Sequence, residues 1–501
     1  MSDLATHLPV LQVVAPLLLA PLVMLLQPRG LAWATATAGS LMALAIALQL
    51  VGTVLAGDEI RYALGGWTAP YGIELRVDGF SALLLLIVTG ASAVALLAAR
   101  RSIDAEIEAH RQPLFYAAWL LALAGLCGIL VSADAFNIFV FMEISSLASY
   151  VLVAGGPDRR ALPAVFKYLI MGTIGATFYL IGVGLVYMMT GTLNLADMEL
   201  RIHEVADQRP ILVAAGFITV GLALKAALFP LHVWLPNAYT YAPHAVTVFL
   251  AACATKVSLY VLLRFDFVVF QQNLVGHETQ FAAFLMPLAV LAILIGSAVA
   301  LFETNLKRLL AYSSVAQIGY ILLGASLVTL AGLSAGMLHM FNHALAKGGL
   351  FLAAMCLATR FATLDLPQLA GAARSMPWTM AALIVAGLSL VGVPGTAGFI
   401  SKWYLVTAAL DEGALGFALI AVIVAGSLMA VAYLWRIVEA AWFATPAVEP
   451  SGRLEGAGEA PLLMLGITWL VALANIFFGF VTGTQRELAE HAAGTLLGHL
   501  P

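Results

Sequence analysis

The sequence predicts an all-α integral membrane protein that crosses the bilayer about fourteen times. Of its 501 residues, 62% are hydrophobic and only 10% are charged, and the mean hydropathy is +0.99. A soluble domain carries charge on about a quarter of its residues. No fold in water could cover this much apolar surface, so the sequence predicts a chain surrounded by lipid.

The apolar residues gather into about fourteen runs that are long enough to cross a membrane as helices. A hydrocarbon core of roughly 30 Å takes about 20 residues of helix. Backbone groups in lipid must find partners within the segment, and the alternating pattern of a membrane barrel is absent from this sequence. The runs lie near residues 8–26, 31–55, 79–99, 113–131, 135–154, 165–189, 210–229, 243–264, 281–301, 309–330, 333–358, 377–409, 415–440 and 461–482.

The cationic residues predict the orientation. With the N-terminus outside, 13 arginines and lysines fall in inside connections and six fall in outside connections. The positive-inside rule therefore predicts that both termini lie on the outer side. The inside group is Arg29, Arg100, Arg101, Arg111, Arg159, Arg160, Lys167, Lys307, Arg308, Arg360, Arg374, Arg436 and Arg453, and the outside group is Arg61, Arg76, Arg201, Arg209, Arg264 and Arg486.

Two pairs of similar segments indicate an internal repeat. GLALK at 221–225 resembles GLSLV at 387–391 (387 − 221 = 166), and SSLASY from Ser145 resembles SSVAQIGY from Ser313 (313 − 145 = 168). Helices 4–8 and 9–13 are therefore predicted to be two copies of a five-helix unit, and an odd number of spans inverts the second copy. The predicted divisions are 1–112 for helices 1–3, 113–264 and 281–440 for the two repeats, and 441–501 for helix 14 and the tail.

Helices 7 and 12, at matching positions of the two repeats, are predicted to be broken. GLALKAALFPLHVWLPNAY contains Pro230 and Pro236, and GLSLVGVPGTAGFISKWYL contains one proline and several glycines. Proline removes a helical hydrogen bond, and broken spans are tolerated where they line a cavity. Paired broken helices point to an ion site near the membrane midplane.

Four of the six lysines, Lys225, Lys256, Lys347 and Lys402, fall inside predicted helices, whereas all 17 arginines sit at helix ends or in loops. Arginine stays protonated in proteins, while a buried lysine can exchange its proton. A charge at the helix centre costs about 2.5–3.5 kcal/mol on insertion scales. The lysines are therefore predicted to handle protons, with snorkelling or static pairing as the alternative.

Glu143, in FVFMEISSLASYVLV, is predicted to lie within the apolar zone and to pair with Lys225. A nearby carboxylate holds the proton of the lysine, and a carboxylate that moves away or is neutralised releases it. A static buried pair that only specifies packing is the alternative.

His339, His343 and Lys347 are spaced i, i+4, i+8, so they share one helix face. A row of titratable groups suits a proton relay. The HxxxH spacing also suits zinc, although no third ligand stands nearby, and plain helix-packing hydrogen bonds are a further alternative. His232 and His244 flank the break after helix 7, where they fit a water-accessible mouth and a structural role equally well.

The sequence contains no motif for metal binding by cysteines, for redox cofactors or for nucleic-acid binding. Cys127, Cys253 and Cys356 lie far apart in apolar helices without metal-ligand spacing. There is no flavin fingerprint, no set of cluster ligands and no basic patch with aromatic platforms for nucleic acid. The sequence therefore predicts no cofactor, no metal, no catalytic site and no nucleic-acid partner. The predicted class is an ion transporter subunit and not an enzyme.

The chain resembles the antiporter-like proton-translocating subunits shared by respiratory complex I, membrane-bound hydrogenases and Mrp-type cation/proton antiporters. The segments that carry the resemblance are FMEISSLASYVLV, FKYLIMGTIGATFYLIGVGLVYMMTGTLNL, KAALFPLHVWLPNAY, LKRLLAYSSVAQIGYILLG, NHALAKGGLF and GFISKWYL, spread over helices 3 to 14. The resemblance implies a Glu143–Lys225 pair in the first half, Lys256 as a connecting lysine, His343 and Lys347 in the second half, and Lys402 as the terminal site. Lys167 also matches a family lysine, with anchoring in a basic loop as an equal alternative.

The segment GGWTAPYGIELRVDGFSALLLL resembles the D subunit of the Mrp-type antiporters most. That resemblance implies a multi-pass subunit of a bacterial inner membrane, together with A- and C-type partner subunits, protons and monovalent cations such as sodium. A proton-pumping subunit of complex I or of a membrane-bound hydrogenase is the second reading. A purely structural subunit is a third reading. The free-energy cost of keeping buried charges that have no function argues against it.

Overall fold

The computed structural model describes residues 6–26, 29–57, 59–270, 277–445 and 458–498. The predicted all-α membrane architecture is confirmed, because twelve of the helices in these ranges are long and apolar enough to cross a bilayer. They are α2 (Leu8–Leu25), α3 (Arg29–Leu55), α4 (Gly79–Glu106), α5 (Gln112–Val131), α6 (Ala135–Ala154), α7 (Ala161–Thr190), α11 (His244–Arg264), α12 (His277–Phe302), α13 (Leu306–Ser326), α14 (Leu330–Ala358), α18 (Gly413–Val438) and α19 (Leu462–Phe480).

The two remaining apolar runs are the two broken helices. The run at 210–229 forms α9 (Arg209–Lys225), which ends in a turn before the short helix α10 (Leu235–Tyr241). The run at 377–409 forms α16 (Pro377–Val391) and α17 (Ala397–Leu410), separated by five non-helical residues. Both predicted breaks are confirmed. Every predicted run contains a helix or a broken helix, while the exact number of membrane crossings stays a prediction.

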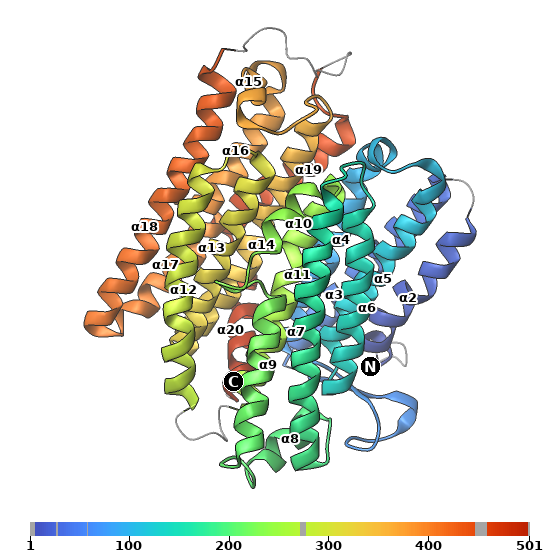
Figure 1. Ribbon diagram of the computed structural model, residues 1–501, viewed down its shortest axis with the longest axis vertical. Helices are drawn as coiled ribbons and strands as arrows, with labels where there is room; N and C mark the ends of the chain where they lie inside the picture. The colour runs from blue at the N-terminus through green and yellow to red at the C-terminus, as the bar shows by residue number, and fades with distance from the viewer. Residues whose placement is uncertain (1–5, 27–28, 58, 271–276, 446–457, 499–501) are drawn as a thin grey trace.

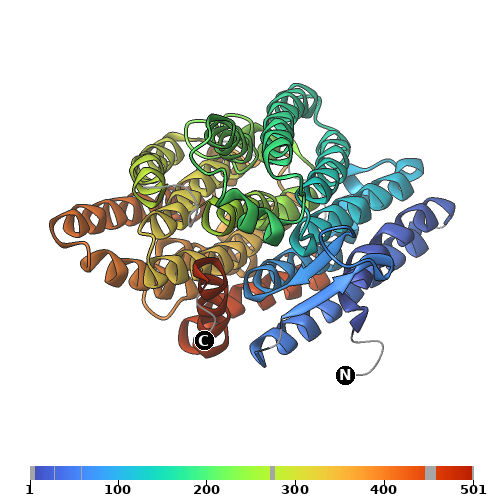
Figure 2. The same ribbon diagram turned by 90° about the horizontal axis from the view of Figure 1, so that it is seen from below.

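The rest of the described chain forms short elements at the two ends of the bundle. A two-stranded antiparallel hairpin, β1 (Ile60–Ala63) and β2 (Glu74–Val77), lies at the same lower end as helix α8 (Leu195–Ile202) in Figure 1. The C-terminal helix α20 (Gly483–Leu497) stands between α14 and α4 (Figure 2). The hairpin was not predicted, because its strands have only four residues. The short turns are η1 (Leu64–Gly66), η2 (Ala109–Arg111), η3 (Phe265–Phe270), η4 (Leu366–Leu369), α15 (Ala372–Ser375) and η5 (Glu439–Phe443).

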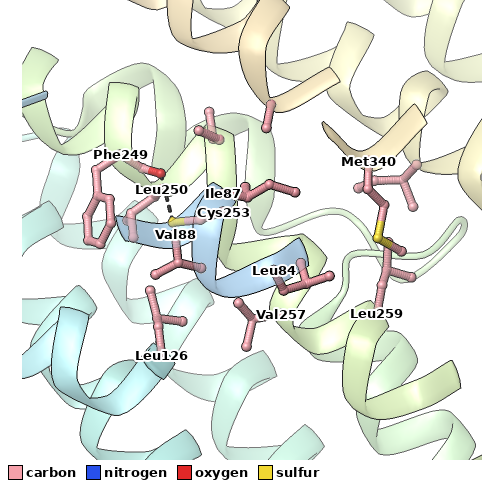
Figure 3. Close-up of a cluster of buried hydrophobic side chains, with 14 of the residues drawn as sticks. Leu84, Ile87, Val88, Leu126, Phe249, Leu250, Cys253, Val257, Leu259 and Met340 are labelled. Atoms are coloured by element: carbon pink, nitrogen blue, oxygen red, sulfur yellow. Dashed lines mark hydrogen bonds between the residues drawn. The ribbon is translucent and has the colours of Figure 1, made fainter. Parts of the chain in front are cut away.

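Helices α11, α13 and α14 form the buried centre of the bundle. In their most apolar stretches 89%, 94% and 89% of the residues are buried, against 28% for α18 at the flank. Figure 3 shows buried side chains of α4, α5 and α14, among them Leu84, Leu126 and Met340, lying around α11. Two of the three central helices, α11 and α14, carry predicted lysines and histidines, so those groups lie far from lipid.

One pair of contacts recurs in the two predicted repeats. Asp134 at the start of α6 forms an isolated β-bridge with Asn194, and Asn305 at the start of α13 forms the same bridge with Asp365. The offset is 171 residues at both positions (305 − 134 and 365 − 194). Two equal offsets in hydrogen-bonded geometry support the predicted repeat, whose boundaries and inversion stay predictions.

Two cations that were assigned to connections, Arg264 and Lys307, lie at helix ends and are buried there. Arg264 lies within a continuous helical segment, because α11 runs on into η3, and its guanidinium is 2.6 and 2.8 Å from the carboxylate oxygens of Asp78. Lys307, the second residue of α13, donates to the carbonyl oxygen of Ala242 at 2.7 Å. Only 5% and 4% of these two residues are exposed. Arg453 lies outside the described residues.

Candidate ion-translocation site

Lys225 and Glu143 lie together, as the sequence predicts. The Lys225 ammonium is 3.5 Å from the Glu143 carboxylate and donates a shorter hydrogen bond, of 2.7 Å, to the Ser146 hydroxyl. The lysine side chain is 6% exposed, whereas that of Glu143 is 29% exposed. The lysine is therefore enclosed by protein while its carboxylate partner reaches the surface of the chain.

The break in helix 7 places the Lys225 ammonium at a helix end. Lys225 is the last residue of α9, and Ala227 adopts a left-handed φ of 55° two residues later. The Trp234 indole N–H donates to the carbonyl oxygen of Leu224 at 2.9 Å, satisfying one of the carbonyls that the break leaves open. The C-terminal end of a helix carries partial negative charge, so the lysine stands where a cation is favoured.

Lys256, on α11, lies at the centre of the molecule and is fully buried. Its ammonium donates to the carbonyl oxygen of Ala251 at 2.8 Å, and no carboxylate of the described residues forms an ion pair with it. It lies close enough to His343 and Lys347 for their charges to interact. A cation without a counter-ion at this depth is electrostatically expensive, so exchange of its proton is the chemistry that the position favours.

The two histidines of α14 stack along one helix face. Their ring centroids are 6.3 Å apart and nearly parallel. His339 is hydrogen-bonded at 2.9 Å to both Ser401 and Gln317. Neither ring nitrogen of His343 has a partner among the described residues, although the side chain is buried. Buried polar atoms are nearly always satisfied, so an ordered water at His343 is expected.

Lys347 continues this face of α14 by one more turn. It is fully buried, and its ammonium donates to the carbonyl oxygen of Leu310 at 2.6 Å and to the hydroxyl of Ser313. The single helix face predicted from the sequence, with His339, His343 and Lys347 in line, is therefore present in the fold.

Lys402, on α17, binds the open end of the other broken helix. Its ammonium donates to the carbonyl oxygens of Leu390 and Val391 at 3.1 and 2.9 Å and to the Ser427 hydroxyl at 3.0 Å. These carbonyls are free of helical partners because α16 ends at Val391, where Gly392 takes a φ of 90°. The lysine thus stands at the negative end of a helix, as Lys225 does.

The position of Lys402 predicts a sharp effect of Gly392→Ala. A Cβ at residue 392 would lie 3.0 Å from Lys402 Cδ, and the left-handed backbone costs a non-glycine residue roughly 1–2 kcal/mol. We expect the complex to assemble with slightly lower stability and its ion exchange to fall, because the ammonium is pushed off the carbonyls. Gly216→Ala, on α9 in open space, is the control for exchange measured in membrane vesicles. Equal exchange in both variants would contradict the prediction.

The helices that carry these groups pack on one another in order. Helix α9 packs on α11, α11 on α14, and α14 on α17. This order links the paired Lys225 to Lys256, then to the face of α14, and finally to Lys402. In Figure 1, α9, α11 and α14 lie towards the middle of the bundle, and α17 lies beside α18 at its flank.

The three residues proposed as access points lie outside this series. Lys167 is exposed on the surface of α7. His232 is half-buried in the turn between α9 and α10, with its ring stacked on Phe229 at 5.3 Å. His244 begins α11.

Near His244 the structure reveals a cluster that the sequence did not predict. The Glu106 carboxylate accepts the backbone N–H of His244 at 3.0 Å and lies 3.8 Å from its ring, and Lys307 interacts electrostatically with the same carboxylate. Lys307 was assigned to an inside connection because it stands at the end of an apolar run, and Glu106 was not singled out. No local signal in the sequence shows that the two ends meet.

A half-buried glutamate followed by two buried histidines and four buried lysines is the pattern expected of a multi-pass membrane protein that moves protons or small cations. Residues 132–429, more than half of the chain, match the transmembrane family described as NADH:quinone oxidoreductase/Mrp antiporter. The chain belongs to this family.

Similar proteins divide between the two branches named in that description. The N subunit of the NADH-quinone oxidoreductase of Desulforudis audaxviator (strain MP104C) is 40% identical, over 93% of this chain and 95% of its own length. The D subunit of the Na(+)/H(+) antiporter of Alkalihalophilus pseudofirmus is 30% identical, over 90% of each chain. A chain in the structure of the Mrp complex from Dietzia sp. DQ12-45-1b superposes with a TM-score of 0.89 at 27% identity, covering 99% of this chain and 98% of that one.

Proposed function

We propose that this chain is the proton-translocating subunit of a multisubunit sodium or other monovalent cation/proton antiporter in a bacterial inner membrane. The observation that carries the proposal is the Glu143–Lys225 pair at a broken helix, continued by buried lysines and histidines on adjacent helices. The relative named as a Na(+)/H(+) antiporter subunit and the likeness to an Mrp complex support the antiporter branch. Both termini are placed on the outer side, and A- and C-type subunits are the expected partners.

In the proposed mechanism, protons pass along the series by exchange between neighbouring groups. The Glu143 carboxylate holds the Lys225 proton when it is ionised and nearby, and the lysine releases that proton when the carboxylate is neutralised or moves away. Loss of the positive charge on Lys225 makes it easier for Lys256 to hold a proton, and the charge state of Lys256 then affects the groups on the face of α14. Cation movement elsewhere in the complex is coupled to these steps. The series consists of Glu143, Lys225, Lys256, His339, His343, Lys347 and Lys402, with Lys167, His232 and His244 as access candidates.

A second candidate is a proton-pumping subunit of a complex I-type or hydrogenase-type assembly. The 40% identity to a protein named as an NADH-quinone oxidoreductase subunit favours it. The same buried series would move protons in such a complex, with redox chemistry in partner subunits. In either case the chain acts as a transport subunit.

The deciding experiment uses energised vesicles from antiporter-deficient cells that express this chain with the products of its neighbouring genes. For an antiporter, sodium addition collapses the pH gradient in proportion to the amount of assembled complex. Vesicles without the chain are the control. An assembled complex that leaves the gradient intact on sodium or potassium addition, yet acidifies vesicles when an electron donor is supplied, would replace the antiporter with the redox-driven pump.

A further inference from the structure

A small cavity beside Lys225 is lined by an unusual number of hydroxyl groups. Its volume is about 30 Å³, which is sufficient for at least one water molecule, since one needs roughly 10–15 Å³. Lys225 and Trp234 are among the residues that line it. The hydroxyls come from Ser145, Ser146, Ser149, Tyr150 and Tyr168, with Ser258 opposite.

Ser146 differs from its serine neighbours in what its hydroxyl binds. Ser145 donates to the carbonyl oxygen of Met142 at 3.0 Å, and Ser149 donates to that of Ser145 at 2.7 Å, so both hydroxyls are committed to the helix backbone. Among the hydrogen bonds of the described residues, Ser146 makes none to the backbone of α6. Its oxygen accepts a hydrogen bond from the Lys225 ammonium. The Ser146 proton can therefore turn toward other acceptors.

Two tyrosines extend the hydroxyl lining away from Lys225, toward the Ala154 end of α6. Tyr150 interacts through its hydroxyl with Ser146, and Tyr168 interacts with Ser149. The two rings pack edge to face with centroids 4.7 Å apart. Gly172 leaves room for the Tyr150 hydroxyl, because a Cβ there would collide with that oxygen. The tyrosine is thus held with its hydroxyl facing the cavity.

We propose that Ser146 passes protons between Lys225 and a water molecule in this cavity, with Tyr150 positioning the serine hydroxyl. This inference rests on the proposed proton path and names the group that loads its first lysine. When Lys225 is neutral, Ser146 Oγ accepts a proton from the water chain and its own O–H bond breaks, delivering that proton to Lys225 Nζ. One O–H bond breaks on the water and one on Ser146, while a new O–H bond forms on Ser146 and an N–H bond forms on Lys225, so the net result is the transfer of one proton to the lysine. The reverse sequence discharges the lysine.

The test compares Ser146→Ala with Ser145→Ala in vesicles that contain the assembled complex. Ser145 lines the same cavity and donates only to the helix backbone, so its variant removes a hydroxyl of the same kind without touching Lys225. We expect exchange to fall about 10²-fold in Ser146→Ala, the lower end of the range for positioned proton transfer, and to stay near wild type in Ser145→Ala. Ser146→Thr keeps the hydroxyl and should restore most of the rate.

The solvent deuterium isotope effect separates proton transfer from a structural role. It should rise in Ser146→Ala, because transfer to Lys225 becomes the slow step, and return toward the wild-type value in Ser146→Thr. If Ser146→Ala fails to assemble, Tyr150→Phe removes only a hydroxyl and should also slow exchange.

Two results would overturn particular parts of the scheme. An unchanged rate and isotope effect in Ser146→Ala, with exchange abolished in Lys225→Ala, would reject the serine relay and leave the proton path standing. Undiminished exchange in Lys225→Ala would reject the proton path itself.

Discussion

Cation/proton exchange should fall by about 10²-fold or more when Lys225 is replaced by alanine, which is the loss typical of removing a positioned proton-transfer group. The Lys225 ammonium is the enclosed member of the ion pair with Glu143. No other described lysine lies within ion-pair distance of the Glu143 carboxylate. Glu143→Ala should have an effect of the same order, because it removes the group that controls the Lys225 proton.

The complex should nevertheless assemble in both variants. Breaking a fully buried ion pair is strongly destabilising because it leaves an uncompensated charge. Here the carboxylate left behind by Lys225→Ala can take up a proton and become neutral, which is how an unpaired carboxylate in an apolar environment avoids the full cost of its charge. In Glu143→Ala the lysine retains its hydrogen bond to Ser146. Loss of exchange should therefore occur at normal amounts of complex.

The measurement is the sodium-dependent collapse of a pH gradient, normalised to the amount of assembled complex. Arg111→Ala is the matched control, because its side chain is 62% exposed, its ion-pair partner Glu108 is exposed too, and it belongs neither to the buried series nor to the access candidates. The double variant of Glu143 and Lys225 should lose no more than either single variant, because groups that act as a unit are not additive. A wild-type rate in either single variant would reject the pair as part of the path.

Arg264→Ala should lower the stability of the assembled protein by about 3–5 kcal/mol, the usual cost of leaving one member of a buried ion pair without its partner. The partner is Asp78, which is 4% exposed and also caps the start of α4 through the backbone N–H of Ser81. The pair joins the end of α11 to the hairpin side of α4. Its loss should therefore loosen two of the helices around the buried centre.

The pair also sets how stability responds to acid. Burial by itself would raise the pKa of Asp78, but the Arg264 guanidinium holds that pKa well below its usual range. The stabilisation is therefore fully present above the pKa of an unfolded aspartate, about 3.9, and is lost only as the pH falls through the lower folded-state value. In Arg264→Ala the cation that remains beside Asp78 is the partly exposed Arg76, 3.8 Å away, so the pKa of Asp78 should rise and its carboxyl should be protonated at a higher pH than in the wild type.

Thermal unfolding of the purified complex in detergent, recorded between pH 4 and 8, checks both parts of this prediction. Arg61→Ala is the control, since its side chain is 57% exposed and its ion pair with Glu59 lies in water. Pairing Arg264→Met with Asp78→Asn should recover much of the loss, because neither side chain then leaves a buried charge. A melting temperature in Arg264→Ala equal to that of Arg61→Ala would contradict the argument.

The sequence by itself determined the features that depend on local composition. Fourteen apolar runs predicted the helices, because a bilayer requires length and hydropathy from each segment separately. Pro230 and the glycines after Val391 predicted the two breaks, because such residues interrupt helical hydrogen bonding wherever they stand. Glu143 and Lys225 could be matched in advance, because each was an isolated charge in an apolar run and needed a partner.

Only the tertiary structure decided which surfaces of the helices meet. Arg264 and Lys307 stand at the ends of apolar runs, where sequence places charges in water, yet helix packing encloses both. Ser146 is one of three serines within five residues, and the rotation of α6 against α9 alone directs its hydroxyl at Lys225. The hydropathy of a segment determines that it forms a helix and spans the membrane. The rotation of that helix about its axis and the choice of its neighbours follow from side-chain packing between segments far apart in the chain. The sequence therefore determines that buried charges exist, and packing determines which of them act together.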